Sequence, residues 1–74
     1  MGKSTARLGN RLRELRQHAG GLTQQELAER VGVTRQTIIA IEGNRYSPSL
    51  EVAFLIAGAL GVGIEQVFQF DPQA

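Results

Sequence analysis

The sequence predicts an all-α domain of short helices, and three features indicate this fold class. Threonine marks two helix starts, at Thr23 and Thr34, because its side chain can cap the first backbone amides of a helix. Gly32 and Gly61 mark helix ends, since glycine adopts the left-handed bend after a helix without strain. Residues 50–60 are almost entirely apolar, as in a buried helix. A chain of 74 residues has room for one such domain.

The first helix is predicted to begin at Asn10, which is a fair N-cap, and to be closed by Gly20–Gly21. Its apolar positions fall three and four residues apart, at Leu12, Leu15 and Ala19. Residues 1–9 are small or polar and show no period, so we expect a flexible start there. The domain proper is expected over residues 10–68, with a tail over 69–74.

The second helix has the clearest start signal in the chain. Thr23 and Glu26 form the capping-box pair T-x-x-E, and Leu22 and Leu27 occupy the two positions of a hydrophobic staple. Gly32 ends this helix after about two turns.

The third helix contains the run Thr37–Ile41, whose β-branched residues favour a strand on propensity alone. Thr34 as N-cap, with Val33 and Ile38 at staple positions, predicts a helix instead. The propensity deficit is about a few tenths of a kcal/mol per residue, and burial of an isoleucine, at about 1.5–3 kcal/mol, outweighs it. One side of this helix then holds Ile38 and Ile41, and the other holds Arg35, Gln36, Ile39 and Ala40.

The connections around the third helix are short. Only Gly32–Thr34 precedes it, and so brief a connector makes the second and third helices cross steeply, as in a helix-turn-helix. Residues 43–47 after it are typical of a turn, in which Asn44 can take a left-handed conformation.

A fourth helix is predicted to begin at Pro48 or Ser49 and to stop before Gly61. Because it is apolar nearly all round, we expect it to be buried on every side. Gly63 then caps a last helical turn that carries Ile64, Val67 and Phe68.

The C-terminal residues Phe68–Phe70 alternate like a short strand before Pro72. Leu8 is expected to lie in a second short strand beside them, which adds a terminal β pairing to the helical fold.

Charge is segregated along the chain. The eight cationic residues all precede Tyr46, where they outnumber four acidic residues, and only three acidic residues follow it. This dipolar layout indicates that the first part of the chain meets an anion, whereas a merely solvated surface would not need the segregation. The cationic residues are Lys3, Arg7, Arg11, Arg13, Arg16, Arg30, Arg35 and Arg45.

Several functional classes find no support in the sequence. There is no cysteine, no apolar run of the ~20 residues that span a bilayer, and no signal pattern at the N-terminus. His18 has no acidic or cysteine partner at metal-ligand spacing. Neither a catalytic constellation nor a glycine-rich phosphate loop occurs. We therefore expect no enzyme, no metal, no cofactor, no small-molecule ligand and no membrane partner, and a cytoplasmic, nucleoid-associated protein.

From Leu22 to Phe68 the chain resembles the Cro/repressor-type (XRE-like) helix-turn-helix DNA-binding domains. The motifs that carry the resemblance are T-Q-x-E-L-A, a glycine turn, a capped helix ending in I-E, and a proline-led apolar helix. Leu12–Arg16 fits the family's first helix. The resemblance implies a five-helix, lambda-repressor-like fold in which residues 35–42 are the recognition helix in the major groove of double-stranded DNA.

The resemblance also assigns roles to matching positions. Arg35, Gln36 and Ile39 match base-contacting positions. Phosphate contacts match Gln24, Thr34, Asn44 and Arg45, together with the backbone amides of Gly43 and Asn44. Arg16 and Glu42 match a partly buried ion pair, whereas Ala40 stands where some relatives carry a base-contacting amide.

The sequence departs from the family pattern at three places. Gly20–Gly21 adds one residue to the first turn, and its effect is open. The order Gly43–Asn44 reverses the commoner one, so either residue can take the left-handed bend. Leu55 and Gly58 occupy positions that are often charged, and an apolar stripe there predicts a dimer interface. The predicted interface residues are Leu55, Gly58, Ala59, Val62 and Phe70.

The sequence thus predicts a homodimeric regulator, most simply a repressor that binds a palindromic operator. Two alternatives stay open: an antitoxin or restriction-modification controller with the same fold, and a protein-interaction adaptor that does not read DNA.

Overall fold

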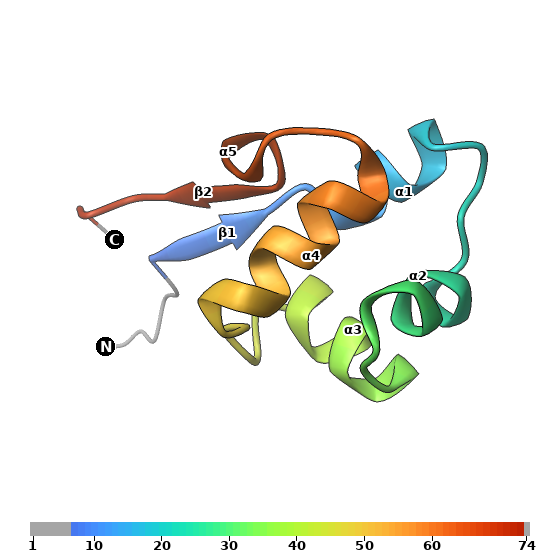
Figure 1. Ribbon diagram of the computed structural model, residues 1–74. Helices are drawn as coiled ribbons and strands as arrows, with labels where there is room; N and C mark the ends of the chain where they lie inside the picture. Colours follow the sequence, from blue (N-terminus) through green and yellow to red (C-terminus); the bar gives the residue numbers. More distant parts are fainter. Residues whose placement is uncertain (1–6, 74) are drawn as a thin grey trace.

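Five short helices and one two-stranded sheet form the part of the chain that the computed structural model describes, residues 7–73 (Figure 1). In chain order the elements are β1 (Leu8–Asn10), α1 (Leu12–His18), α2 (Gln24–Val31), α3 (Arg35–Glu42), α4 (Leu50–Leu60), α5 (Ile64–Val67) and β2 (Phe68–Phe70). The predicted helical fold with a short terminal β pairing is confirmed. The flexible start predicted for residues 1–9 lies, over residues 1–6, outside the described residues.

The helix-turn-helix forms as its capping residues predict. Thr23 Oγ1 accepts a hydrogen bond from the Glu26 amide at 3.0 Å, and Glu26 Oε1 accepts one from the Thr23 amide at 2.9 Å, which completes the capping box. Gly32 then takes the left-handed conformation with φ 84°, and Thr34 Oγ1 accepts from the Thr37 amide at 3.2 Å. The strand-like run of Thr37–Ile41 is therefore helical, with α3 packed against α2 (Figure 1).

The capping box makes the stability of the protein depend on pH. The hydrogen bonds to Thr23 lower the pKa of Glu26, which means that folding favours the carboxylate. This contribution is complete above the ordinary glutamate pKa and is lost as the pH falls through the lowered one. We expect the melting temperature of Glu26→Gln to fall less steeply than that of the wild type below about pH 5, so that the two curves converge in acid. Glu29→Gln, which removes a charge from the same helix without touching its cap, is the control.

Helix α1 is shorter at both ends than its sequence predicts. It begins at Leu12, and Asn10 is not the N-cap residue but the last residue of β1. The Asn10 Oδ1 atom nevertheless accepts a hydrogen bond from the Leu12 amide at 3.0 Å. It thus satisfies one of the free amides at the start of α1, although Asn10 lies one residue before the N-cap. At the other end α1 stops at His18 and Ala19 is exposed, and Gly20 and Gly21 follow with φ 83° and 78°.

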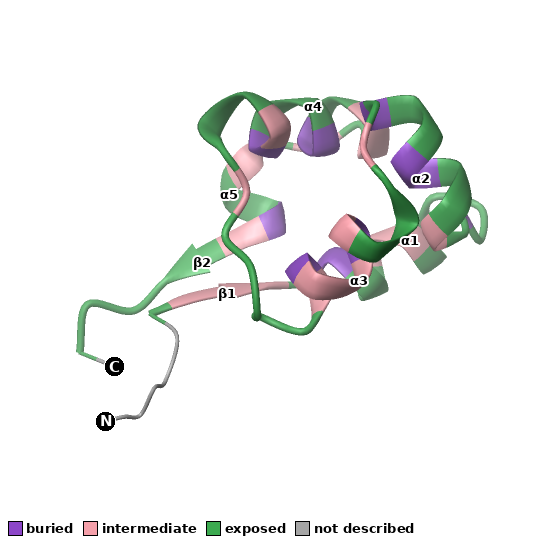
Figure 2. Cartoon of the chain, turned by 90° about the horizontal axis from the view of Figure 1, so that it is seen from below, coloured by how far each residue is buried: buried purple, intermediate pink, exposed green. Residues whose placement is uncertain are grey.

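The two terminal strands pair antiparallel, with Leu8 opposite Phe70 and Asn10 opposite Phe68. The β pairing predicted for Leu8 and Phe68–Phe70 is confirmed. Residues 8 and 9 thus belong to a strand whose partner lies far along the chain. The sheet lies at one end of the molecule, beyond the helices (Figures 1 and 2).

One hydrophobic core joins the helices, and each of α1 to α5 contributes buried residues to it (Figure 2). The core residues are Leu12, Leu22, Leu27, Ala28, Val31, Ile38, Ile41, Ile56, Ala57 and Val67. Among residues 7–73, no helix is long and apolar enough to cross a membrane.

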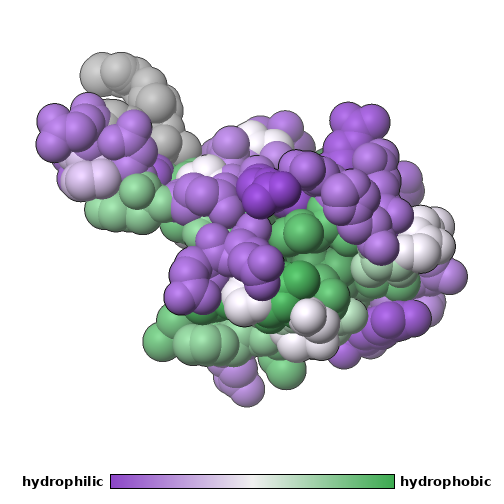
Figure 3. Space-filling view, turned by 90° about the horizontal axis from the view of Figure 1, so that it is seen from above, coloured by the Kyte–Doolittle hydropathy of each residue, from purple (hydrophilic) through white to green (hydrophobic). Residues whose placement is uncertain are grey.

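The fourth helix, α4, is buried on one side only, so the prediction that it is buried all round is wrong. Ala53 and Ile56 face the core, whereas Leu50, Phe54 and Leu55 are 70%, 56% and 45% exposed. The reason is geometric, since α2 and α5 cover the inner side of α4 and a chain this small has no further element for the outer side. Figure 3 shows hydrophobic residues gathered on part of the surface seen from above.

Candidate nucleic-acid interface

Helix α3 presents two chemically different sides. Ile38 and Ile41 are 0% and 1% exposed in the core, and they fix the helix from beneath. Arg35 and Gln36, in the first turn, are exposed, while Ile39 and Ala40 are partly exposed. The polar pair that the sequence assigned to base contacts therefore projects from a rigidly anchored helix.

A second set of donors lies at the N-terminus of α2. The backbone amides of Gln24 and Gln25 belong to the first turn, where no carbonyl of the same helix can accept from them. No hydrogen bond from either amide occurs within residues 7–73. Free amides at a helix N-terminus, together with the helix dipole, are suited to a phosphate group.

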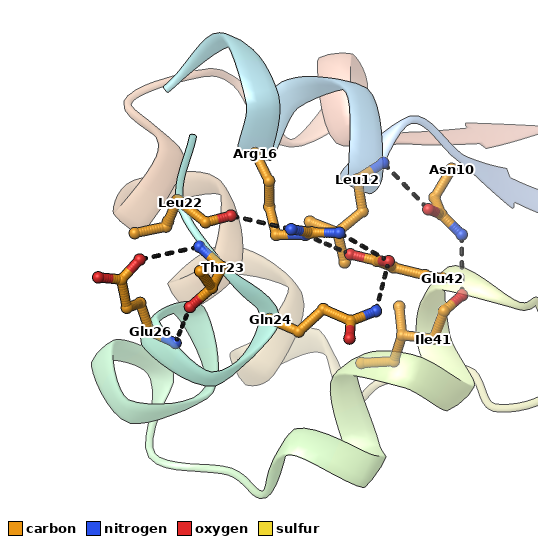
Figure 4. A network of polar contacts seen from close by, with 9 residues as sticks. All are labelled: Asn10, Leu12, Arg16, Leu22, Thr23, Gln24, Glu26, Ile41 and Glu42. Atoms are coloured by element: carbon orange, nitrogen blue, oxygen red, sulfur yellow. Dashed lines mark hydrogen bonds and ion pairs between the residues drawn. The ribbon is translucent and has the colours of Figure 1, made fainter. Parts of the chain in front are cut away.

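A polar network joins α1, α2 and α3 behind this surface (Figure 4). Arg16 donates to both carboxylate oxygens of Glu42, from Nε at 2.6 Å and from Nη2 at 3.2 Å. Arg16 Nη1 also donates to the Leu22 carbonyl at 2.9 Å, and Gln24 Nε2 donates to Glu42 Oε1 at 3.1 Å. The ion pair predicted between Arg16 and Glu42 is present, and both side chains are close to 90% buried. The network sets the position of α2 and α3 relative to each other.

The turn after α3 decides which of Gly43 and Asn44 takes the left-handed bend. Asn44, with φ 58°, takes the left-handed bend, and Gly43 has φ −86°. The Gly43 and Asn44 amides donate to the carbonyls of Ile39 and Ile41, each at 3.0 Å. Helix carbonyls already accept from these two amides, so a phosphate contact through them would have to share their hydrogens, and it stays a prediction. The side chains of Asn44 and Arg45 stay as predicted phosphate contacts.

The cations at this surface are not neutralised by neighbours. Within residues 7–73, Arg35 and Arg45 form no ion pair, whereas Arg11 pairs with Glu14 in the open. The Arg45 guanidinium lies over Gly43, where an added Cβ would come within 2.9 Å of its Nη1. The hydroxyl of Thr34, another predicted phosphate contact, forms a hydrogen bond with the hydroxyl of Thr37 at 3.0 Å.

The residues predicted for a dimer interface do not all lie together. Leu55 and Gly58 are exposed on α4, while Ala59 and Val62 are partly buried and pack against the core. Phe70, 64% exposed, is the last residue of β2, whose end projects away from α4 (Figures 1 and 2). Leu50 and Phe54 are also exposed on α4, which the sequence did not lead us to expect. Their spacing of four residues places them on one side of the helix.

Comparison with known proteins agrees with this geometry. The family model described as "Helix-turn-helix" matches residues 12–67, which is most of the chain. The chain belongs to this helix-turn-helix family. It is a domain of the Cro/repressor (XRE-like) type, and the family consists of DNA-binding transcription regulators rather than enzymes.

Curated relatives of this helix-turn-helix protein carry names of the same kind. An uncharacterized HTH-type transcriptional regulator of Methanothermobacter thermautotrophicus is 69% identical over 52 residues, which cover 69% of this chain and 75% of that protein. The Bacillus subtilis regulator YgzD is 44% identical over 64 residues, or 86% of this chain and 96% of YgzD. The immunity repressor of Bacillus phage phi105 is 37% identical over 60 residues, or 81% of this chain and 41% of the repressor.

A solved structure shares the fold as well. A Bacteroides fragilis protein proposed to bind DNA superposes with a TM-score of 0.76 at 27% identity, covering 84% of this chain and 98% of that one.

Proposed function

We propose that this helix-turn-helix protein is a homodimeric, sequence-specific repressor that inserts α3 into the major groove of a palindromic operator. The observation that carries the proposal is the exposed pair Arg35 and Gln36 on a helix whose underside, Ile38 and Ile41, is fully buried. The similarity to a phage immunity repressor supports repression as the simplest outcome of DNA binding.

Three side chains of α3 would read bases. The forked guanidinium of Arg35 matches the O6 and N7 acceptors of guanine, and the Gln36 carboxamide matches N6 and N7 of adenine. Ile39, partly exposed one turn later, can contact a thymine methyl group. Each good bidentate pair is worth about 1–3 kcal/mol of discrimination against the wrong base.

Phosphate contacts would fix the register of α3 in the groove. The free amides of Gln24 and Gln25 and the side chains of Thr34, Asn44 and Arg45 are the proposed donors.

Arg45→Ala tests this phosphate role. We expect weaker binding to all duplexes, and a slope of log affinity against log salt that is shallower by about 2, because the dimer loses one phosphate contact in each of its two copies. Arg11→Ala is the control, since Arg11 is engaged by Glu14 and its loss should leave the slope nearly unchanged. A slope that Arg45→Ala leaves intact would remove Arg45 from the interface.

The proposed dimer rests on the outer side of α4. Leu55 is 45% exposed there, and Gly58 sits inside the helix, where glycine costs about 1 kcal/mol relative to alanine. A Cβ at Gly58 would meet nothing within 4 Å, so no contact within the described residues requires a glycine. Close approach of a second copy of α4 would require one.

Sedimentation at micromolar concentration tests the dimer. We expect the wild type to be dimeric and Leu55→Lys to be monomeric but folded, because the leucine is half exposed in one copy. Ala19→Lys, at the exposed C-cap residue of α1, should stay dimeric. A wild type that is only monomeric would refute this part of the proposal.

Selection of binding sites from random duplexes at low salt tests the function itself. A two-fold dimer places its recognition helices about 34 Å apart, one turn of duplex, so the selected half-sites should lie 10–10.5 base pairs apart, centre to centre, as is typical of such dimers. If no consensus emerges, a protein-interaction adaptor on the same scaffold becomes the better account.

A further inference from the structure

The side chain of Asn10 connects two parts of the chain that are more than 30 residues apart. Its Nδ2 donates to the Ile41 carbonyl at 2.9 Å and to Asn44 Oδ1 at 3.0 Å. Its Oδ1 accepts from the Leu12 amide at 3.0 Å. Figure 4 shows the carboxamide between the start of α1 and the last turn of α3. Both donors of the amide are thus used, so its orientation is fixed.

Within residues 7–73, the other backbone hydrogen bonds of the turn that Asn10 contacts run to carbonyls of α3 itself. Asn44 is the one non-glycine residue with positive φ among residues 7–73, and it is exposed. Its backbone amide and that of Arg45 donate to the last carbonyls of α3, at 3.0 and 2.9 Å. The Asn10 side chain, by contrast, restrains the turn from outside α3. It bonds Asn44, the residue that sets the direction in which the chain leaves the helix.

We propose that Asn10 is a positioning residue for DNA binding, which holds the turn at Asn44 so that Arg45 is in place before a phosphate arrives. The inference rests on the proposed function, because it needs Arg45 to meet a phosphate. A turn that is already ordered loses less conformational freedom on binding, and this strengthens the complex without any contact between Asn10 and DNA.

Asn10→Ser separates this role from the capping of α1. The serine oxygen can still accept from the Leu12 amide, but it is too short to reach Ile41 and Asn44. In the free protein we expect the Arg45 amide to exchange its hydrogen about fivefold faster, because a net hydrogen bond that restrains the turn is lost. The core amide of Ile56 should exchange at an unchanged rate.

The second readout is DNA affinity, measured in a double-mutant cycle of Asn10→Ser and Arg45→Ala. Asn10→Ser should weaken affinity for the selected operator about fivefold in the wild type, and less than about twofold when Arg45 is already alanine. Its salt slope should fall toward that of Arg45→Ala. These differences separate an effect through Arg45 from one through Asn44, the other proposed phosphate contact in this turn, because an effect through Asn44 would persist when Arg45 is alanine.

Three results would overturn the inference alone: unchanged exchange of the Arg45 amide, equally faster exchange at Ile56, or the same loss of affinity in both backgrounds. A wild-type protein that binds no duplex is a separate failure. It would overturn the proposed function, and this inference with it, before any variant is compared.

Discussion

Glu42→Ala is expected to lower the free energy of unfolding by about 3–5 kcal/mol, the usual cost of removing one member of a buried ion pair. Among the described residues, the substitution leaves the Arg16 guanidinium, whose side chain is 11% exposed, with only the Leu22 carbonyl as a partner. It also removes the acceptor of Gln24 Nε2. Denaturant unfolding monitored by circular dichroism measures the loss.

Replacing both members of the pair distinguishes an unpaired charge from lost packing. Arg16→Met combined with Glu42→Leu should recover much of the stability, since apolar replacements of similar volume are often neutral at buried pairs. A loss below about 1 kcal/mol for Glu42→Ala would show that the network is as weak as an exposed ion pair.

Ile38→Ala is expected to cost about 2–5 kcal/mol of stability, because it leaves a cavity beneath the recognition helix. Ile39→Ala, a neighbouring change on the partly exposed side, should leave the melting temperature nearly unchanged. When both variants are assayed under conditions in which they are folded, Ile39→Ala should weaken DNA binding more than Ile38→Ala does. The loss should appear at sites with a thymine at the contacted position. Equal destabilisation by the two variants would contradict the two-sided reading of α3.

The local signals in the sequence predicted the helix-turn-helix well. Thr23 with Glu26 and Thr34 with Thr37 are contacts between residues three apart, so a capping pattern alone reveals them. The same holds for the two sides of α3, which follow from helical periodicity. The Arg16–Glu42 pair, separated by 26 residues, came only from family resemblance.

Features that depend on distant contacts were missed or misread. Asn10 looked like an N-cap, because nothing near it in the sequence shows that its carboxamide meets Ile41 and Asn44. The outer side of α4 looked buried, because apolar composition does not tell whether the covering surface belongs to the same chain. The choice between Gly43 and Asn44 for the left-handed bend is a local feature, but it depends on the backbone hydrogen bonds of the finished turn, which residue types alone do not reveal.

The central claim is that the outer side of α3 reads base pairs while the core holds its inner side. Site selection repeated with Gln36→Ala tests it most directly, since the substitution removes one carboxamide from an exposed position. The account predicts a consensus with unchanged spacing that loses its preference at one base pair in each half-site, with discrimination there reduced by about 1–3 kcal/mol. A consensus identical to that of the wild type, at every position, would contradict it.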